Sequence, residues 1–551
     1  MKNSGNKLYD MKNIIYLFFA AFILTSCELE VEPTDKYSDV VAWKDEEYLD
    51  LYVKGFYAAL RDNAEIYTDK FSDGCSDILK YCISNLNDKT DQNKILLSKN
   101  YITPSNGALS TWGNYDRIKL ENEFLYDVDV KAAHMDPEFV KIRKAEVRFL
   151  RAYLYYKMIR NHGGIILRLH NTGVDGGLDN DKDAVKARIS EEESWDFVIK
   201  ELEEVAADLT GQTWDADNYG RITAGAAYAL ITRCALYAKK YDKVISAGQE
   251  VEKLGYIIEP KYEDVFKNLA NREIILPVTF KVPTYVHFHD RYFRPIGDKA
   301  SRGGWACPTE ELVSLFQIKE NGVYVDFDWN NPVHKANPYV GREPRFYTSI
   351  LYNGAPWNGR EIETFVGGKD GYTDFDFSSN NSACVTGYFM KKFLQEKNTT
   401  YDETGSDSYW VELRYAEVLM NMAEAYAQSG DVQTGYEYLN KVRTRGNELS
   451  GYSVGSNLQI FMNCLEKEKM VEFAFEGLRY WDLRRWKRAV AVIDGQRAHG
   501  IKITKNSDNS LTYTKVVCDD DDRYFPEKYY YIPIPTSEIN NNSACIQTEL
   551  W

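Results

Sequence analysis

Residues 136–164 read DPEFVKIRKAEVRFLRAYLYYKMIRNHGG and carry the clearest helix signal in the chain. Asp136 suits the N-cap of a helix, and Pro137 suits its first position. Apolar residues then recur three and four positions apart, at Ile142, Ala145, Phe149, Ala152, Tyr156 and Ile159. One such stripe predicts an amphipathic helix, which the pair Gly163-Gly164 ends.

Further helices are predicted on both sides of this one. A helical pattern begins around Glu46, and a capping box of Ser190 and Glu193 opens a helix that carries Trp195. Thr223 opens another, whose partner stops at Gly255. Residues 46–257 are therefore predicted to form an N-terminal helical region.

The junction of the last helix pair recurs later in the chain. Tyr237-Ala238-x-x-x-Asp242 is echoed by Tyr426-Ala427-x-x-x-Asp431. Short-looped helix pairs of this kind resemble tetratricopeptide-type repeats, and generic helical packing is the alternative. We predict a mainly α fold with a tetratricopeptide-like scaffold, which returns as a C-terminal helical region over residues 406–551.

The character of the sequence changes between residues 258 and 405. Gly, Asn, Pro and aromatic residues dominate there, and only short strand-like fragments appear, such as 274–279. Trp305, Trp329 and Trp357 lie among turn residues. Because long irregular segments in a compact protein usually carry function, we predict a loop-rich, partly β ligand-binding region.

The N-terminus reads as an export signal. Lysines precede eleven apolar residues, Ile14 to Leu24, a run too short to span a bilayer. The ending Leu24-Thr25-Ser26-Cys27 resembles the lipobox of bacterial lipoproteins, which predicts a signal peptide over 1–26 and acylation of Cys27. Residues 27–45 would be a lipidated acidic tether. An ordinary signal peptide is the alternative, and either Met1 or Met11 can be the start.

The composition narrows the classes of partner. The formal net charge of −16 over 551 residues argues against nucleic acid and against electrostatic attachment to anionic lipid. Aromatic residues make up 14% of the chain, with 41 Tyr and 11 Trp. This abundance suggests aromatic surfaces that bind something. The cysteines show no metal-ligand spacing, and no disulfide framework is predicted.

Five segments, in order along the chain, resemble the RagB/SusD family. They are Trp112-x-x-Tyr115 leading to Asn122, the helix from Ala145 to Tyr153, Arg414 to Arg445, Glu472 to Trp486, and Ile532-Pro533-Ile534-Pro535. One departure is that Ile166-Leu167 replaces a valine-proline pair often found after the two glycines. The resemblance spans the chain.

The resemblance implies a helical-repeat fold with a loop-rich ligand face. It also implies a surface lipoprotein in the outer membrane of a Bacteroidetes-type bacterium. Such a protein caps a SusC-type TonB-dependent transporter, binds a glycan or another large nutrient, and delivers it for import. Our leading hypothesis is a protein that binds this ligand without chemistry.

Residues 472–486 are rich in both arginine and aromatic residues, which could suggest nucleic acid. Acidic residues are interleaved at spacings that permit i,i+3 and i,i+4 pairs with the arginines. We interpret the segment as a core helix with paired charges. The ligand site must therefore lie in the irregular parts.

Sugar rings have an apolar face that stacks on aromatic rings and hydroxyls that bond to amides and guanidinium groups. The family places its binding surface on the early polar segment and the middle region. The positions that fit are Trp305, Trp329, Trp357, Tyr81, Tyr101 and Tyr324, with Asn100, Asn330 and Arg291 as polar partners. For each tryptophan, burial under a loop is the alternative.

No cofactor, metal site or catalytic residue is predicted. His287-x-His289 supplies two imidazoles without a third ligand, and no GxSxG, HExxH or phosphate loop occurs. Asp519 to Asp522 reads as a solvated acidic loop. Two alternatives to the binding protein remain: a lipid-anchored glycoside hydrolase, and a helical-repeat scaffold that binds only protein.

Overall fold

The computed structural model describes residues 39–83, 91–169, 185–298, 303–378 and 383–551. The chain divides into two compact units, residues 1–54 and 55–551. The predicted signal peptide, the predicted lipidation site Cys27 and the tether up to residue 38 lie outside the described residues. The described part of the first unit contains α2 (Asp39–Ala42) and most of α3 (Glu46–Phe56), so the helix predicted from Glu46 is confirmed.

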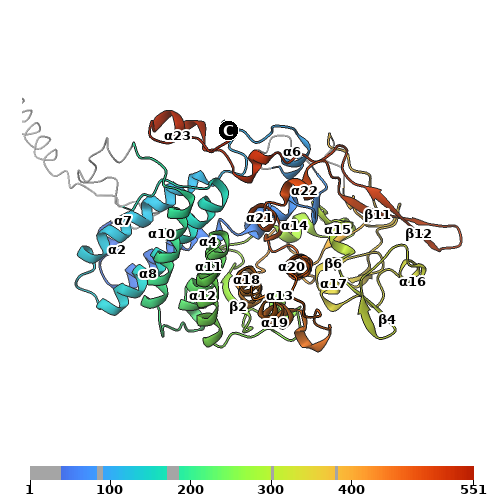
Figure 1. Cartoon of the computed structure of the whole chain (residues 1–551), viewed down its shortest axis with the longest axis horizontal. Helices are drawn as coiled ribbons and strands as arrows, with labels where there is room; N and C mark the ends of the chain where they lie inside the picture. The colour runs from blue at the N-terminus through green and yellow to red at the C-terminus, as the bar shows by residue number, and fades with distance from the viewer. Residues whose placement is uncertain (1–38, 84–90, 170–184, 299–302, 379–382) are drawn as a thin grey trace, which may run out of the picture. The chain divides into compact units, whose positions relative to one another are not determined.

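The second unit is built on a series of long helices. They are α7 (Tyr115–Lys131), α8 (Pro137–His162), α10 (Glu191–Asp208), α11 (Ala224–Tyr237), α12 (Tyr241–Lys253), α18 (Tyr415–Gln428), α19 (Val432–Arg443) and α20 (Leu458–Glu472). Each helix contacts the next in this order, so α12 packs against α18 although the middle region separates them in sequence (Figure 1). The scaffold is helical, as predicted.

Local sequence sets the ends of these helices where it was expected to. The Asp136 carboxylate accepts hydrogen bonds from two backbone N–H groups of the first turn of α8, and Gly163 ends that helix with a φ of 77°. Ser190 and Glu193 form the capping box of α10, and the Thr223 hydroxyl caps α11. These caps satisfy N–H groups that a helix leaves unpaired.

The predicted echo corresponds to two helical hairpins, α11–α12 and α18–α19. The repeats meet closely, because a side chain at Gly248 of α12 would overlap Met422 of α18. The two junctions differ in detail. Asp431 caps α19, whereas Asp242 lies inside the first turn of α12.

The strands of the described residues pair in antiparallel twos. The pairs are β1 (Leu79–Tyr81) with β3 (Ala306–Pro308), β2 (Ile274–Val278) with β10 (Trp410–Arg414), β4 (Ile318–Glu320) with β5 (Val323–Val325), β6 (Ile350–Leu351) with β9 (Phe389–Met390), β7 (Pro356–Trp357) with β8 (Arg360–Glu361), and β11 (His499–Lys505) with β12 (Leu511–Val517). The β2–β10 pair brings together the two ends of the middle region, and β1–β3 joins that region to the early polar segment.

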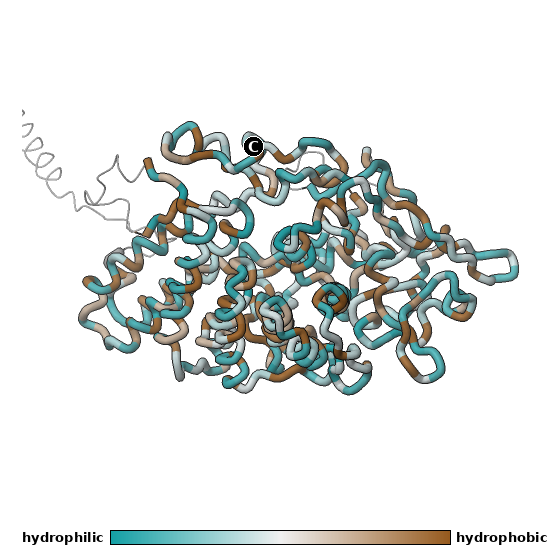
Figure 2. Tube along the Cα trace, viewed as in Figure 1, coloured by the Kyte–Doolittle hydropathy of each residue, from teal (hydrophilic) through white to brown (hydrophobic). Residues whose placement is uncertain are grey.

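Short helices complete the second unit. They are α4 (Ala58–Arg61), α5 (Glu65–Thr68), α6 (Gln92–Leu97), α13 (Asp264–Lys267), α14 (His289–Phe293), α15 (Glu310–Val313), α16 (Pro332–Ala336), α17 (Pro344–Ser349), α21 (Arg479–Arg485), α22 (Ala489–Ile493) and α23 (Thr536–Asn541). Hydrophilic and hydrophobic residues alternate along the helices (Figure 2), as expected for elements that bury one face.

The continuous helix predicted over residues 472–486 is wrong. Helix α20 ends at Glu472, and α21 starts at Arg479. Between them Gly477 adopts a φ of 70°, at a position where a side chain would overlap the Glu65 carboxylate. The Asp73 carboxylate accepts hydrogen bonds from the N–H groups of Gly477 and Arg479. A partner about 400 positions away thus takes the place of helical hydrogen bonding.

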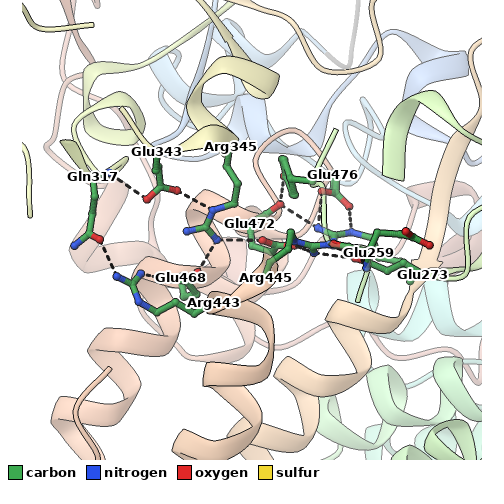
Figure 3. Close-up of polar contacts among 12 residues, drawn as sticks. Glu259, Glu273, Gln317, Glu343, Arg345, Arg443, Arg445, Glu468, Glu472 and Glu476 are labelled. Atoms are coloured by element: carbon green, nitrogen blue, oxygen red, sulfur yellow. Dashed lines mark hydrogen bonds and ion pairs between the residues drawn. The ribbon is translucent and has the colours of Figure 1, made fainter. Parts of the chain in front are cut away.

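The charges at the end of α20 belong to a buried ion network (Figure 3). It joins β2, β10, α17 and α20 through the residues Glu273, Glu343, Arg345, Lys392, Arg414, Arg443, Arg445, Glu468, Glu472 and Glu476. Burial opposes ionisation of Glu472, but Arg445, Arg414 and Arg345 outweigh it and lower the pKa of this carboxyl. The paired-charge interpretation is confirmed, although most partners are distant in sequence.

Candidate functional site

The candidate site is centred on α14 in the middle region. Two buried histidines, one within this short helix and one just before it, hold it against the core. The ring of His289 stacks on Phe293, and a ring nitrogen of His287 lies 2.9 Å from the carbonyl oxygen of Ser408. Both imidazoles are buried, which lowers their pKa values, that of His287 to about 4. They therefore pack as neutral core side chains.

Tyr292 of α14 and Trp305, the residue before β3, form an aromatic platform. The two ring centres are 3.9 Å apart, the planes are 24° apart, and both side chains are half-buried. The backbone N–H of Trp305 donates to the backbone carbonyl of Tyr292. The backbone carbonyl of Trp305 accepts a hydrogen bond from the backbone N–H of Cys82. The platform is thus held on two sides by backbone hydrogen bonds.

Arg291 supplies charge at the edge of this platform. Its guanidinium lies 5.8 Å from the centre of the Tyr292 ring, and its Nε lies 3.4 Å from the Asp402 carboxylate. The structure thereby brings together two of the predicted residues, Arg291 and Trp305, through Tyr292. A flat aromatic surface beside a half-buried guanidinium can stack on a ring and donate hydrogen bonds to hydroxyls.

Trp357 is buried and is not part of the platform. Its exposed fraction is 1%, its indole N–H donates to the Asp298 carboxylate over 2.7 Å, and the Arg294 guanidinium lies 5.1 Å from its ring centre. Arg360 bonds to the same Asp298. This tryptophan is therefore a buried part of a polar network.

A cavity of about 720 Å³, the middle cavity, opens beside this network. Its wall includes the aromatic residues Phe266, Trp357, Phe393 and Tyr409 and the polar residues Gln395, Asn398, Thr400, Thr404 and Ser408. The turn that contributes Thr400 and Thr404 also carries Asp402, the partner of Arg291. The middle cavity and the platform therefore share one loop.

Three of the four lysines that line the middle cavity have partners among the described residues. Lys267 pairs with Glu263, Lys391 donates to the carbonyl of Tyr347, and Lys392 pairs with Glu476. Burial lowers the pKa of Lys392 to about 8, although Glu476 acts in the opposite direction. The lining therefore combines aromatic faces and amide and hydroxyl groups with charges of both signs, a combination that suits a polyhydroxylated ligand.

The other predicted residues lie in two separate places. The Trp329 indole N–H donates to the Glu310 carboxylate, and Asn330 donates to the Asp328 carboxylate. Tyr324 lies on β5, with the ammonium of Lys319 from β4 5.5 Å from its ring centre. Tyr81, Tyr101 and Asn100 lie in the early segment. Tyr81 is buried with its hydroxyl bonded to the backbone of residues 69 and 71, Tyr101 is half-buried near Lys94, and exposed Asn100 accepts from Tyr524.

Several residues of the candidate site were not anticipated, chiefly Tyr292 and Asp402. Tyr292 follows the predicted Arg291 directly, so an aromatic residue beside a candidate cation was the available signal. Asp402 carries no such signal, because only the loop conformation brings it to Arg291.

The structure also corrects the prediction for the acidic segment 519–522. The interpretation of 519–522 as a solvated loop is wrong for its first residue, which is buried and pairs with Lys80 and Arg523. Within the described ranges, no three His, Cys, Asp or Glu side chains are grouped to hold a metal ion. Helices there all lack the length and hydrophobicity needed to cross a bilayer.

Comparisons with known proteins cover almost the whole chain. A family model described as "SusD family" matches residues 272–551, and one described as "Starch-binding associating with outer membrane" matches residues 29–236. The chain is 23% identical to SusD-like protein P38 of Formosa agariphila, over 88% of this chain and 93% of that protein.

Two solved structures from Bacteroides fragilis NCTC 9343 have a similar fold. One, a SusD-like protein, is 25% identical with a TM-score of 0.77, over 94% of this chain and 100% of that one. The other, titled a SusD-like carbohydrate binding protein, is 22% identical with a TM-score of 0.75, over 91% and 99%. These matches agree with the predicted helical-repeat fold.

Proposed function

This chain belongs to the SusD family, and from that premise we propose that it is a surface lipoprotein that binds an extracellular oligosaccharide or polysaccharide, or another large nutrient. It delivers this ligand to a SusC-type TonB-dependent transporter. The observation that carries the proposal is the half-buried stack of Tyr292 and Trp305 beside Arg291. The family description "Starch-binding associating with outer membrane" supports both the ligand class and the location.

In this proposal different segments of the chain have different roles. Cys27 carries the lipid and residues 27–45 form the tether. The helical scaffold consists of residues 46–257 and 406–551, and the ligand-binding surface lies in residues 258–405. Trp329, Trp357, Tyr81, Tyr101, Tyr324, Asn100 and Asn330 stay candidates for contacts outside the platform.

Binding is proposed to occur without chemistry on the ligand. Calorimetry of the purified chain against a panel of neutral and acidic polysaccharides should detect binding of at least one, with no release of reducing sugar on prolonged incubation. Release of product would favour the glycoside hydrolase instead. Failure to bind any glycan, together with capture of a protein ligand, would favour the scaffold.

Delivery requires a transporter partner. Mild detergent extraction of outer membranes from the source organism, followed by affinity purification of the tagged chain, should recover a TonB-dependent transporter in stoichiometric amount. A chain that is purified alone, while still binding glycan, would contradict the delivery step and leave the binding step intact.

A further inference from the structure

A second cavity, of about 400 Å³, lies where the helical scaffold meets the C-terminal family motifs. We call it the basic cavity. Its charged lining residues are Arg160 of α8, Glu191 and Glu192 of α10, Lys239 at the α11–α12 junction, and Arg484, Arg485 and Lys487 from α21 onward. None of these residues belongs to the platform or the middle cavity, so the basic cavity is a separate site.

Arg160 has an unused hydrogen-bonding edge. Its Nη1 donates to the Tyr156 hydroxyl over 2.7 Å, and its guanidinium lies 3.7 Å from the centre of the Trp481 ring. Its Nε is buried and has no hydrogen-bond partner, and Nη2 has none within the described part of the chain. Buried donors are nearly always paired, and the Nε–Nη2 edge matches two oxygens of an oxyanion.

Arg484 is bonded without being neutralised. It donates to the backbone carbonyls of Asn161 and Tyr530 at 3.2 and 3.1 Å, so its donors are satisfied while its positive charge stays uncompensated. The positive charge of Arg484 also affects the pKa of neighbouring His162. Burial, and then the positive charges of Arg188 and Arg484, lower the pKa of His162 to about 3.

Two lysines add to the positive potential. The ammonium of Lys487 lies 4.2 Å from the Tyr530 ring centre, and neither Lys487 nor Lys239 has a carboxylate at ion-pair distance among the residues described. Of the two lining carboxylates, Glu191 accepts from the Tyr531 hydroxyl and the Trp195 indole. Arg485 pairs with Glu424 and Asp482. Arg160, Arg484, Lys239 and Lys487 thus line the cavity without an ion-pair partner among the residues described, alongside two carboxylates.

We propose that the basic cavity binds a sulfate or phosphate group, either as the free ion or as an ester on a sugar. A tetrahedral oxyanion offers acceptors in several directions at once, which suits an arginine edge and two lysines better than a single carboxylate does. The rings of Tyr237 and Tyr530 in the same wall leave an apolar face for an attached sugar. The proposal does not depend on glycan binding at the platform.

The test compares sulfate, phosphate and chloride at equal ionic strength, by calorimetry and thermal unfolding of the purified chain. Sulfate or phosphate should bind saturably and raise the melting temperature, whereas chloride should not. The double variant Lys239→Gln/Lys487→Gln should bind at least tenfold more weakly with its fold intact. Lys515→Gln, which removes an exposed charge on β12, is the matched control and should bind like the wild type.

Two further arms sharpen the result. Arg160→Lys retains the charge but removes the two-donor edge, and should also weaken sulfate binding about tenfold. If glucose 6-sulfate binds at least tenfold more tightly than sulfate and glucose alone does not bind, the ligand is the ester. Equal affinities identify the free ion.

The proposal is overturned if sulfate, phosphate and glucose 6-sulfate all fail to bind, or if the double variant and Lys515→Gln bind them equally well. Trp305→Ala should leave sulfate binding unchanged. Failure of glycan binding at the platform is therefore distinguishable from failure of this site.

Discussion

The Nη1 atom of Arg414 and the Oε1 atom of Glu472 lie 2.8 Å apart, and both side chains are buried. Arg414 ends strand β10, and Glu472 ends helix α20. The same arginine also bonds to Glu273 and Glu476. One guanidinium thus connects the strand pair at the ends of the middle region to the scaffold helices.

Removing one partner of this network should be strongly destabilising. Arg414→Met leaves three carboxylates with one cation fewer, and breaking a buried pair costs about 3–5 kcal/mol. Lys441→Met, which breaks an exposed pair with Glu252, is the control and should cost less than about 1 kcal/mol. Chemical denaturation measures both, and equal losses would contradict a structural role for the network.

The buried His162 should make the free energy of unfolding depend on pH. Its Nε2 accepts from the Thr111 N–H, and its Nδ1 lies 2.9 Å from the Ile532 carbonyl, an arrangement that holds only the neutral ring. Its folded pKa of about 3 lies below the unfolded value of about 6.5. The unfolded chain therefore binds the proton first, and stability is lost as pH falls from about 6.5 towards 3.

Urea denaturation between pH 7.5 and 4 measures this dependence. The His162 contribution should approach about 1.4 kcal/mol per pH unit below pH 6. His162→Gln should show a shallower slope by that amount, while exposed His134→Gln should retain the wild-type slope. Parallel slopes for all three proteins would be evidence against a neutral buried His162.

Trp305 should carry much of the glycan affinity. Trp305→Ala removes one of the two half-buried rings of the platform, and binding should weaken at least tenfold, or about 1.4 kcal/mol. Tyr126→Ala removes a 66% exposed aromatic ring on α7 and should leave affinity unchanged. Affinity gels with the best-binding polysaccharide would show the difference, and unchanged migration of Trp305→Ala would reject the platform as the site.

Gly164 should not tolerate a side chain. A methyl group there would overlap the backbone carbonyl oxygen of Ile189, which cannot rotate away, so Gly164→Ala should cost about 1–3 kcal/mol. Gly113 has no atom within 4 Å of the same position, and Gly113→Ala should be neutral or slightly stabilising. Melting temperatures compare the two variants; equal values would mean that the chain relaxes around Gly164.

The proposed tether makes a cellular prediction. Cys27→Ala should release a folded chain that still binds glycan but no longer supports uptake, because lipid attachment positions it above the transporter. Cell fractionation and uptake of labelled oligosaccharide measure the two effects. Growth on the glycan at the wild-type rate would refute the role of the anchor.

Prediction succeeded where structure depends on neighbours in sequence. The caps at Asp136, Ser190 and Thr223 require partners two or three residues away, so they can be recognised without a fold. The periodic stripe of α8 likewise specifies a helix before its packing is known. The echo at Tyr237 and Tyr426 indicated the two repeat hairpins for the same reason.

The sequence by itself determined a mainly helical scaffold, its family and an irregular region rich in tryptophan, since these depend on periodicity and on local motifs. Only the tertiary structure decided where the helical pattern breaks after Glu472, which aromatic residues are half-exposed, and which charges are neutralised. Each of these depends on partners far apart in the chain. Asp73 interrupts the helix, Asp298 holds Trp357 inside, and Lys80 pairs with Asp519.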